Sequence, residues 1–380
     1  LLLGSLAVFK YLNFFVENLN RIDGVALKVR NIALPIGISF YTFQILSYLI
    51  DLYWEKVSVQ KSYFRFTLYV CLFPQLIAGP IVRYETVERE ISLRRESWEE
   101  AVGGMRRFIL GLAKKVLIAN SIGALWTDVK AQDYASMPAA TAWLGIAAFT
   151  LQIYFDFSGY SDMAIGLGKM LGFDFPENFR YPYNSKSIAE FWRRWHITLG
   201  DWFKSYVYFP LGGSRGSTAA TIRNTLIVWL LTGLWHGASW NFILWGLYYG
   251  VLIILEKFVF RRLLERTPSA LRHILTMLAV VFGWVIFEIT SPASELEFVK
   301  AMLGFGGSFA NSFTLNALHN YAVTFIAAIA ISTGIPLKIC KKLPEKRADT
   351  LSLVGEAAGM TACIACLVDS GYNPFLYFNF

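Results

Sequence analysis

The feature that most constrains this chain is a series of apolar windows, each about 20 residues long, with few or no charged side chains. A helix of that length crosses a bilayer core of about 30 Å. The composition agrees, because 55% of the residues are hydrophobic and 16% are charged, whereas soluble domains carry about 25% charged residues. The sequence does not show the segments of about ten residues with alternating hydrophobicity that are typical of an outer-membrane barrel. We therefore expect an all-α, polytopic membrane protein.

Basic residues gather in short segments between the apolar runs, at 21–30, 257–272 and 338–347. This distribution is typical of cytoplasmic loops under the positive-inside rule. The formal net charge of +8 therefore does not indicate nucleic acid, and the lipid bilayer is the expected partner. Because Leu1 stands inside an apolar run, we expect the first spans of a longer protein to precede it. Residues 1–380 are interpreted as a single transmembrane domain.

The apolar runs predict spans whose interiors are mostly uncharged. They cover residues 1–19, 31–53, 108–126, 139–173, 221–235, 242–255, 275–289, 321–335 and 351–368, with 371–380 outside. The run 64–82 contains Pro74, Gly79 and Pro80, which favour a broken or re-entrant segment over a straight helix. Residues 83–107 are charged and predict a cytoplasmic loop with a surface helix.

The run 139–173 carries Asp156 and Asp162 among apolar residues. Acids inside a membrane are functional candidates by default. The alternative is a buried carboxylate that hydrogen-bonds backbone groups or an arginine. Lys114 and Lys115 interrupt the preceding run and indicate either a membrane interface or a wet pocket for an anionic acyl donor. Glycines in this run, such as Gly159, are expected to allow close helix packing.

Ser187 and Glu190 match a capping box, which predicts a helix that begins at this point. Apolar and aromatic side chains from Ile188 to Phe203 fall on one side of that helix, and charged side chains fall on the other. The pattern resembles an interfacial amphipathic helix. His196 lies at the edge of its apolar face.

Two of the four histidines, His196 and His236, each follow a tryptophan directly. His236 lies in a long apolar run that residues 236–241 interrupt. A histidine in a membrane interior must be neutral or paired, and a neutral imidazole can take a proton from a hydroxyl. We expect the two imidazoles to converge in one membrane-embedded site, with His236 as the base and His196 as a second polar anchor or proton partner.

Acyl transfer from a thioester to an alcohol needs a base, a site for the developing oxyanion and exclusion of water. Asp156, Asp162 or Asn241 could orient His236. No serine or cysteine is predicted to lie on the sharp strand-to-helix turn, or elbow, that presents a covalent nucleophile. The alternative from the residues alone is a polysaccharide or lipid transporter whose histidines and acids form a hydrogen-bonded relay.

Motifs spread over nearly the whole chain resemble the membrane-bound O-acyltransferase (MBOAT) family, in its bacterial alginate O-acetyltransferase branch. They are Phe191-Trp-Arg-Arg-Trp-His196, Leu234-Trp-His-Gly237, Ile77-Ala-Gly-Pro-Ile-Val-Arg83, Gly111-Leu-Ala-Lys-Lys-Val116, Tyr154-Phe-Asp-Phe-Ser-Gly-Tyr-Ser-Asp-Met-Ala-Ile-Gly166, Tyr181-Pro-Tyr-Asn184, Pro210-Leu-Gly-Gly-Ser-Arg215 and Pro374-Phe-Leu-Tyr-Phe-Asn-Phe380.

By this resemblance, His236 matches the catalytic histidine of the family and His196 its second histidine position. Asn184, in Tyr-Pro-Tyr-Asn, fits as a supporting residue. The resemblance implies a ring of tilted helices around a funnel-shaped centre. It also implies acetyl-CoA as the acyl donor, with no permanently bound cofactor and no metal ion.

The resemblance further implies a multi-pass protein of the bacterial inner membrane. The acetyl group would pass to a periplasmic or extracellular partner protein that modifies an exported polysaccharide such as alginate. The family also contains D-alanyl transferases for wall polymers, which take their acyl group from a carrier protein, so that activity stays open as an alternative.

Overall fold

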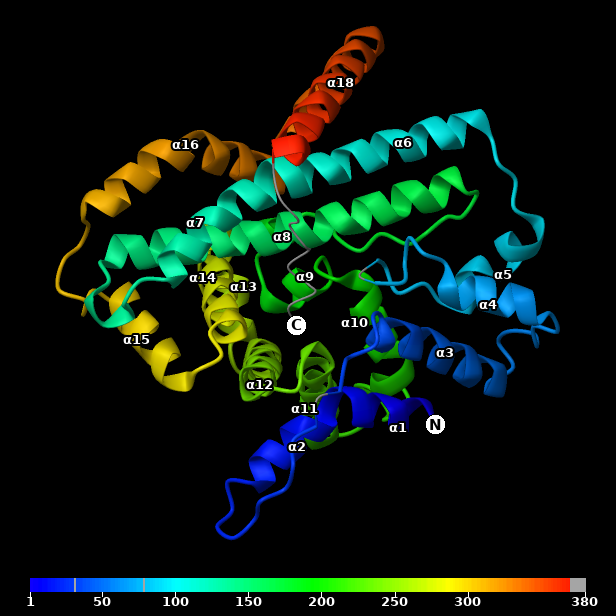
Figure 1. Cartoon of the computed structure of the whole chain (residues 1–380), viewed down its shortest axis with the longest axis horizontal. Helices are drawn as coiled ribbons and strands as arrows, with labels where there is room; N and C mark the ends of the chain where they lie inside the picture. Colours follow the sequence, from blue (N-terminus) through cyan, green and yellow to red (C-terminus); the bar gives the residue numbers. More distant parts are fainter. Residues whose placement is uncertain (31, 78, 370–380) are drawn as a thin grey trace.

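The computed structural model describes residues 1–30, 32–77 and 79–369. Within these ranges the chain is helical and contains no strand, which confirms the all-α prediction. Figure 1 shows the short α9 (Ile188–Trp192) and α10 (Ile197–Phe203) near the centre, with the longer helices arranged around them. The predicted terminal segment 371–380 and its motif lie outside the described residues. The funnel shape of the centre remains a prediction.

Two long helical segments run antiparallel along one side of the molecule (Figure 1). One is continuous from α6 (Trp98–Ala113) through the π-helical turn η2 (Lys114–Ala119) to α7 (Asn120–Lys130), and the other is α8 (Ala139–Met170). A Cβ at Gly111 would lie 2.5 Å from the Gly159 oxygen, so the two backbones meet where neither residue has a side chain. The prediction of close packing at Gly159 is therefore confirmed.

A helical hairpin forms the opposite side of the centre. It consists of α11 (Thr218–His236) and α12 (Trp240–Ile254), and π-helical η6 (Leu255–Val259) continues α12. The two helices approach closely at Gly233 and Gly246. A Cβ at Gly233 would lie 2.3 Å from the Phe242 oxygen, and one at Gly246 would lie 2.3 Å from the Trp229 oxygen. These glycines therefore allow the hairpin to close directly after His236.

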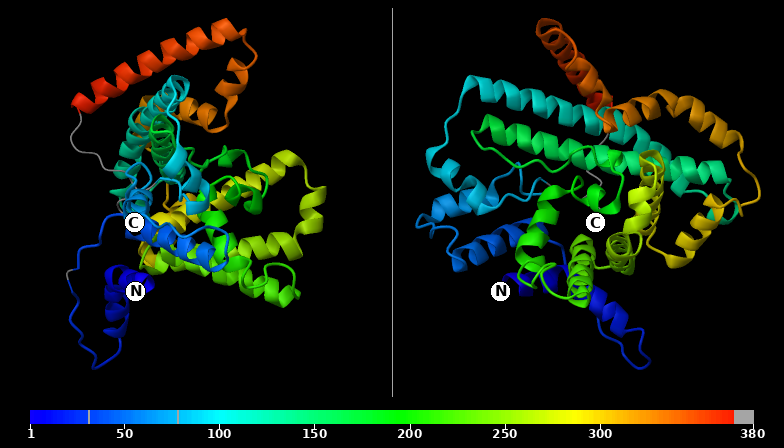
Figure 2. Two further views of the ribbon diagram at one scale, coloured as in Figure 1. Left: turned by 90° about the vertical axis from the view of Figure 1, so that its right-hand side faces the viewer. Right: turned by 180° about the vertical axis from the view of Figure 1, so that it is seen from behind.

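Five helical segments of the described chain are long and apolar enough to cross a membrane. They are Trp98–Lys130, Trp240–Val259, α14 (Ser269–Glu288), α16 (Ser312–Ser332) and α18 (Glu345–Asp369). The prediction of a polytopic membrane protein is thereby confirmed. Helix α8, which is not among them, packs inside the molecule and buries most of its side chains. Figure 2 shows α18 at the periphery, beside α6.

The remaining helices connect these parts. They are α1 (Leu2–Leu6), η1 (Ala7–Tyr11), α2 (Leu12–Leu19), α3 (Ile38–Tyr53), α4 (Tyr63–Cys71), α5 (Tyr84–Leu93), η3 (Tyr134–Ser136), η4 (Pro182–Asn184), η5 (Lys204–Tyr208), α13 (Arg261–Arg266), α15 (Pro292–Met302) and α17 (Ile335–Cys340). The broken segment expected in 64–82 is confirmed, because α4 ends at Cys71 and the next helix of the described chain, α5, begins at Tyr84.

Three boundaries were predicted wrongly. In the span expected over 31–53, helix α3 begins at Ile38, after Gly37 turns the chain with a positive φ of 76°. Residues 98–107, expected in a charged loop, begin the long α6 instead, because the cap at Ser97 starts a helix that packs along α8. The helix expected from Ser187 ends after Trp192 and restarts at Ile197. Most of its apolar side chains, such as Phe191 and Trp202, are buried within the protein, and its interfacial position stays a prediction.

Candidate active site

His236 is the last residue of α11, at the point where the hairpin breaks. The next residue, Gly237, is extended, and a Cβ there would lie 2.3 Å from the ring of Phe242. The His236 side chain is buried, and its ring meets Trp245 and Phe287 edge to face at centroid distances of 4.9 and 5.3 Å. Its Nδ1 is buried without a hydrogen-bond partner in the part of the chain that the structure describes. Aromatic packing therefore fixes this ring.

A pocket of about 190 Å³ opens at His236. Its wall is the segment from Leu34 to Phe40, which includes the turn at Gly37, together with Lys10 and Ile77. A Cβ at Gly37 would lie 2.6 Å from the Leu76 oxygen, so this turn packs against the chain beside Ile77. The pocket gives a small group access to a histidine that is otherwise enclosed.

The N-terminal helices anchor the end of α11. Lys10 Nζ donates to the Trp235 oxygen at 2.5 Å and to Ser39 Oγ at 3.2 Å, and the Tyr11 hydroxyl donates to the Leu234 oxygen at 2.6 Å. The last carbonyls of a helix lack partners within it and carry partial negative charge. A cation and a hydroxyl from 223–225 residues away in the sequence thus cap α11 immediately before His236.

Lys10 was missed by the sequence analysis. The one signal that could have identified it is its isolated positive charge within the apolar run 1–19.

His196 lies between α9 and α10 and has left-handed backbone angles, φ 44° and ψ 53°. Backbone hydrogen bonds to a neighbouring segment stabilise this turn. The Ile197 amide donates to the backbone oxygen of Asn178 at 3.0 Å, and the Arg180 amide donates to the backbone oxygen of Arg194 at 2.9 Å. These bonds pair residues 178–180 with 194–197 and explain why the predicted helix does not continue.

The side chain of Asn178, which the sequence analysis also missed, fixes the His196 ring. Asn178 Oδ1 accepts from the Thr198 amide at 3.3 Å and contacts His196 Nδ1 at 3.0 Å. A backbone amide only donates, so this atom is the amide oxygen and His196 Nδ1 must carry the proton. Nε2 is then the nitrogen with the lone pair. It is buried and has no partner within the described ranges.

The two predicted histidines come together around Trp235. The Trp235 ring lies 5.7 Å from the His196 ring and 5.0 Å from the His236 ring, measured between centroids. His196 and Lys10 are both near enough to interact electrostatically with His236. The expected convergence of residues 40 positions apart in the sequence is therefore present in the structure.

The predicted acids lie along the contact between α6–α7 and α8. Asp156 pairs with Lys115, and both side chains are buried. Asp162 accepts from Lys114 at 2.5 Å and from Arg107 at 2.8 Å, and Arg107 also binds Glu177. These ion pairs join two helices. They agree with the alternative interpretation, in which Asp156 and Asp162 are buried carboxylates paired for structure. Lys114 and Lys115 likewise have carboxylate partners.

The two predicted asparagines bind backbone carbonyls. Asn241 Nδ2 donates to the Phe287 oxygen at 2.8 Å, and Asn184 Nδ2 donates to the Thr333 oxygen at 2.9 Å. Asn241 stands near the site, because the Phe287 ring packs against His236. Its Oδ1 is buried without a partner among the residues described. A supporting role for either residue stays a prediction.

Comparisons with known proteins agree on one family. Residues 55–294 match the membrane-bound O-acyltransferase (MBOAT) family. The chain is 44% identical over 305 residues to a probable alginate O-acetylase of Pseudomonas aeruginosa, covering 79% of this chain and 58% of that protein. It is 35% identical over 332 residues to a peptidoglycan O-acetyltransferase of Helicobacter pylori, covering 80% and 63%.

The chain is more distantly similar to a protein whose name gives D-alanyl, not acetyl, as the transferred group. The chain is 26% identical over 276 residues to a teichoic acid D-alanyltransferase of Bacillus subtilis, covering 67% of this chain and 68% of that protein. The chain spans 58–61% of the length of the alginate relatives from Pseudomonas aeruginosa and Azotobacter vinelandii.

Proposed function

Because this chain belongs to the membrane-bound O-acyltransferase family, we propose that it transfers an acyl group from a thioester to a hydroxyl, with His236 as general base. The observation that carries the proposal is the placement of His236. It ends a broken helix, its ring is fixed by aromatic contacts, and it lines a pocket of about 190 Å³. A packed histidine with access to a small pocket can meet a hydroxyl while bulk water is excluded.

In this mechanism the neutral His236 ring takes the proton of the acceptor hydroxyl as its oxygen attacks the thioester carbonyl. The tetrahedral intermediate carries negative charge on the former carbonyl oxygen. It collapses when the carbon–sulfur bond breaks, and the imidazolium returns the proton to the departing thiolate. General base assistance of this kind is worth about 10²–10⁴ in rate.

His196 supplies a second polar atom. Its Nε2 bears a lone pair because Asn178 holds the proton on Nδ1. In the proposed mechanism a bridging water donates one hydrogen to this atom and its other hydrogen to the oxygen of the acceptor hydroxyl. The single proton of that hydroxyl is then directed to His236. Nε2 has no hydrogen-bond partner in the described chain, and this supports the proposal. A buried acceptor without a partner costs free energy unless a ligand donates a hydrogen bond to it.

The proposed donor is acetyl-CoA, and the proposed acceptor system is an exported polysaccharide served by a periplasmic or extracellular partner protein. The names of the alginate and peptidoglycan relatives support an acetyl group and a polysaccharide. The bacterial inner membrane is the proposed location, which agrees with the apolar helices and the basic loops. A second candidate, D-alanyl transfer from a carrier protein, is favoured by the name of the more distant Bacillus subtilis relative.

The test replaces His236 with alanine and measures acetyl ester on the exported polysaccharide of cells that carry the variant. Ester should fall to background while the amount of membrane protein is unchanged. His319, an exposed histidine whose Nδ1 contacts only the neighbouring Asn320 among the hydrogen bonds of the described chain, gives a matched control when replaced by alanine. Normal ester in the His236→Ala cells would defeat the proposal. Membranes supplied with labelled acetyl-CoA or with a D-alanyl carrier protein separate the two candidate activities.

A further inference from the structure

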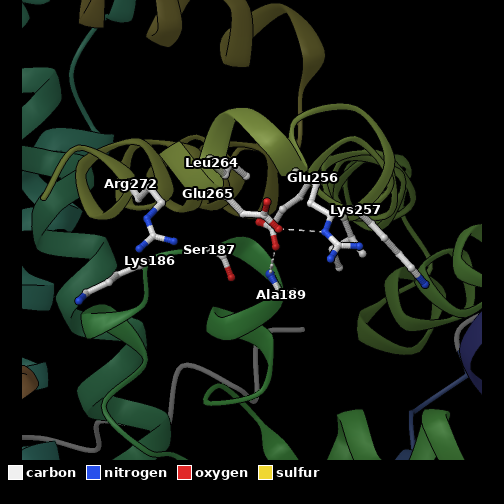
Figure 3. Close-up of a pocket in the computed structure, with 10 residues that line it drawn as sticks. Lys186, Ser187, Ala189, Glu256, Lys257, Leu264, Glu265 and Arg272 are labelled. Atoms are coloured by element: carbon white, nitrogen blue, oxygen red, sulfur yellow. Dashed lines mark hydrogen bonds and ion pairs between the residues drawn. The ribbon is translucent and has the colours of Figure 1, made fainter. Parts of the chain in front are cut away.

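A second pocket, of about 390 Å³, lies where four helical segments meet (Figure 3). Its walls come from the start of α9, from the end of the α12–η6 segment together with α13, and from the first turn of α14. Two of these elements belong to the candidate membrane spans Trp240–Val259 and Ser269–Glu288. The pocket therefore lies at the turn between two spans, where a membrane helix meets the lipid headgroups.

Cationic side chains surround this pocket. Figure 3 shows Arg272 on one side and Glu256 and Lys257 on the other, with Ser187 and Ala189 between them. The pocket is lined by Lys186, Lys257, Arg261 and Arg272, against the carboxylates of Glu256 and Glu265.

The carboxylates of Glu256 and Glu265 already have hydrogen-bond partners within the protein. Glu256 accepts from the backbone amides of Ile188 and Ala189 at 2.7 and 3.3 Å, and thereby caps α9. Glu265 accepts from Arg261 at 3.1 Å.

The charge of Arg272 is not matched in this way. Its Nε is buried and has no hydrogen-bond partner within the described chain. The Arg272 guanidinium and the Lys186 ammonium form no hydrogen bond or ion pair with any residue that the structure describes. Lys257 contacts only neutral groups there, Ser214 Oγ at 3.0 Å and the ring of Phe258 at 5.3 Å from its centroid. The pocket therefore keeps an excess of positive charge, and a buried donor without a partner is costly unless a ligand accepts from it.

The surroundings of the pocket are apolar and exposed. Val259, Phe260 and Leu263, on the same turn, are 60%, 44% and 63% exposed. Apolar side chains beside cations at the end of a membrane span are typical of contact with the headgroup region of a bilayer.

From these observations we propose that the pocket binds a phosphate group, with Arg272 as its main ligand and Lys186 and Lys257 at its rim. Guanidinium groups bind phosphate oxygens through paired, charge-assisted hydrogen bonds. Basic pockets between membrane helices bind the headgroups of anionic lipids. The phosphate can come from a membrane phospholipid or from a phosphorylated acyl donor such as coenzyme A. The second source rests on the proposed function, and the first does not.

The test measures ligand retention by the full chain in native mass spectrometry, with phosphatidylglycerol, phosphatidylcholine and coenzyme A as separate probes. Arg272→Gln removes the central cation, and Arg266→Gln, on α13 but outside the pocket lining, is the matched control. We expect Arg272→Gln to retain the bound probe about fivefold less than Arg266→Gln does. Arg272→Lys, which keeps the charge, should restore part of the binding.

The arms identify the source of the phosphate. Loss confined to phosphatidylglycerol assigns the site to lipid, and loss confined to coenzyme A assigns it to the donor. Equal retention of every probe by Arg272→Gln and Arg266→Gln, in protein that unfolds at the normal temperature, would overturn the proposal. Because retention is measured without acyl transfer, an inactive His236 variant can still show binding, so the two proposals fail separately.

Discussion

At the scale of single residues, the site depends on contacts that hold the histidines from outside their own helices. Asn178 fixes the proton of His196 on Nδ1, and Lys10 caps the helix that ends at His236. Neither residue belongs to a motif that the sequence analysis used to define the site. The histidines could be found by residue type, but the groups that orient them come from elsewhere in the chain.

Replacement of Asn178 by alanine should lower the turnover number about tenfold or more, because it removes the acceptor that selects the His196 tautomer. Substrate KM should change less than kcat. The measurement is initial rates of labelled acetyl transfer in membranes. Asn320, an exposed asparagine on α16 that contacts neither His196 nor His236 in the described chain, is the matched control when changed to alanine. An unchanged kcat in Asn178→Ala would contradict this assignment.

Replacement of Lys10 by methionine keeps the aliphatic stem but removes the hydrogen bonds to Trp235 and Ser39. A hydrogen bond from a charged group contributes about 1.5–3 kcal/mol, and we expect acyl transfer to fall about tenfold as the end of α11 loses its cap. Lys28→Met, on the exposed segment after α2, is the control and should keep normal activity. Equal activity of the two variants would show that the cap does not position His236.

At the scale of elements, the hairpin of α11 and α12 places His236 because two glycines let the helices touch. Gly233→Ala would bring a Cβ within 2.3 Å of the Phe242 oxygen, a backbone atom that cannot move alone. We expect a loss of about 1–3 kcal/mol in unfolding free energy, seen as a lower melting temperature. Gly359→Ala, on α18 with nothing within 4 Å of the new Cβ, is the control. It should be neutral or slightly stabilising, since alanine favours helix.

The contact of α6–α7 with α8 depends on buried ion pairs. Lys115→Met would take from Asp156 the cation with which it pairs at a site closed to water. Removal of one partner of a buried pair typically costs about 3–5 kcal/mol. We expect a strong fall in thermal stability, and the double variant Lys115→Met with Asp156→Leu should recover much of it. If the double variant is less stable than the single variant, the pair does not act as a unit.

At the scale of the whole molecule, the positive-inside rule predicts the sidedness of the chain. Arg266 and Ser308 lie on opposite sides of the candidate span Ser269–Glu288. We expect a cysteine at Ser308 to react with an impermeant thiol reagent in intact spheroplasts, and a cysteine at Arg266 to react only after the membrane is opened. The native cysteines are first replaced by alanine. Labelling of both positions from the same side would contradict the topology.

The sequence alone determined the class of fold and the family, and it predicted that His196 and His236 lie close together. Long uncharged runs can only be membrane or core helices, and the break at His236 was readable because residues 236–241 interrupt an apolar helix. The tertiary structure alone decided the break before His196, the role of Asn178 and Lys10, and the pairing of Asp156 and Asp162 with cations. The physical reason is the distance along the sequence over which each kind of interaction acts. Hydrophobic periodicity records which residues are buried, whereas a partner for a buried polar group can come from any distance along the chain, and only the fold selects which one arrives.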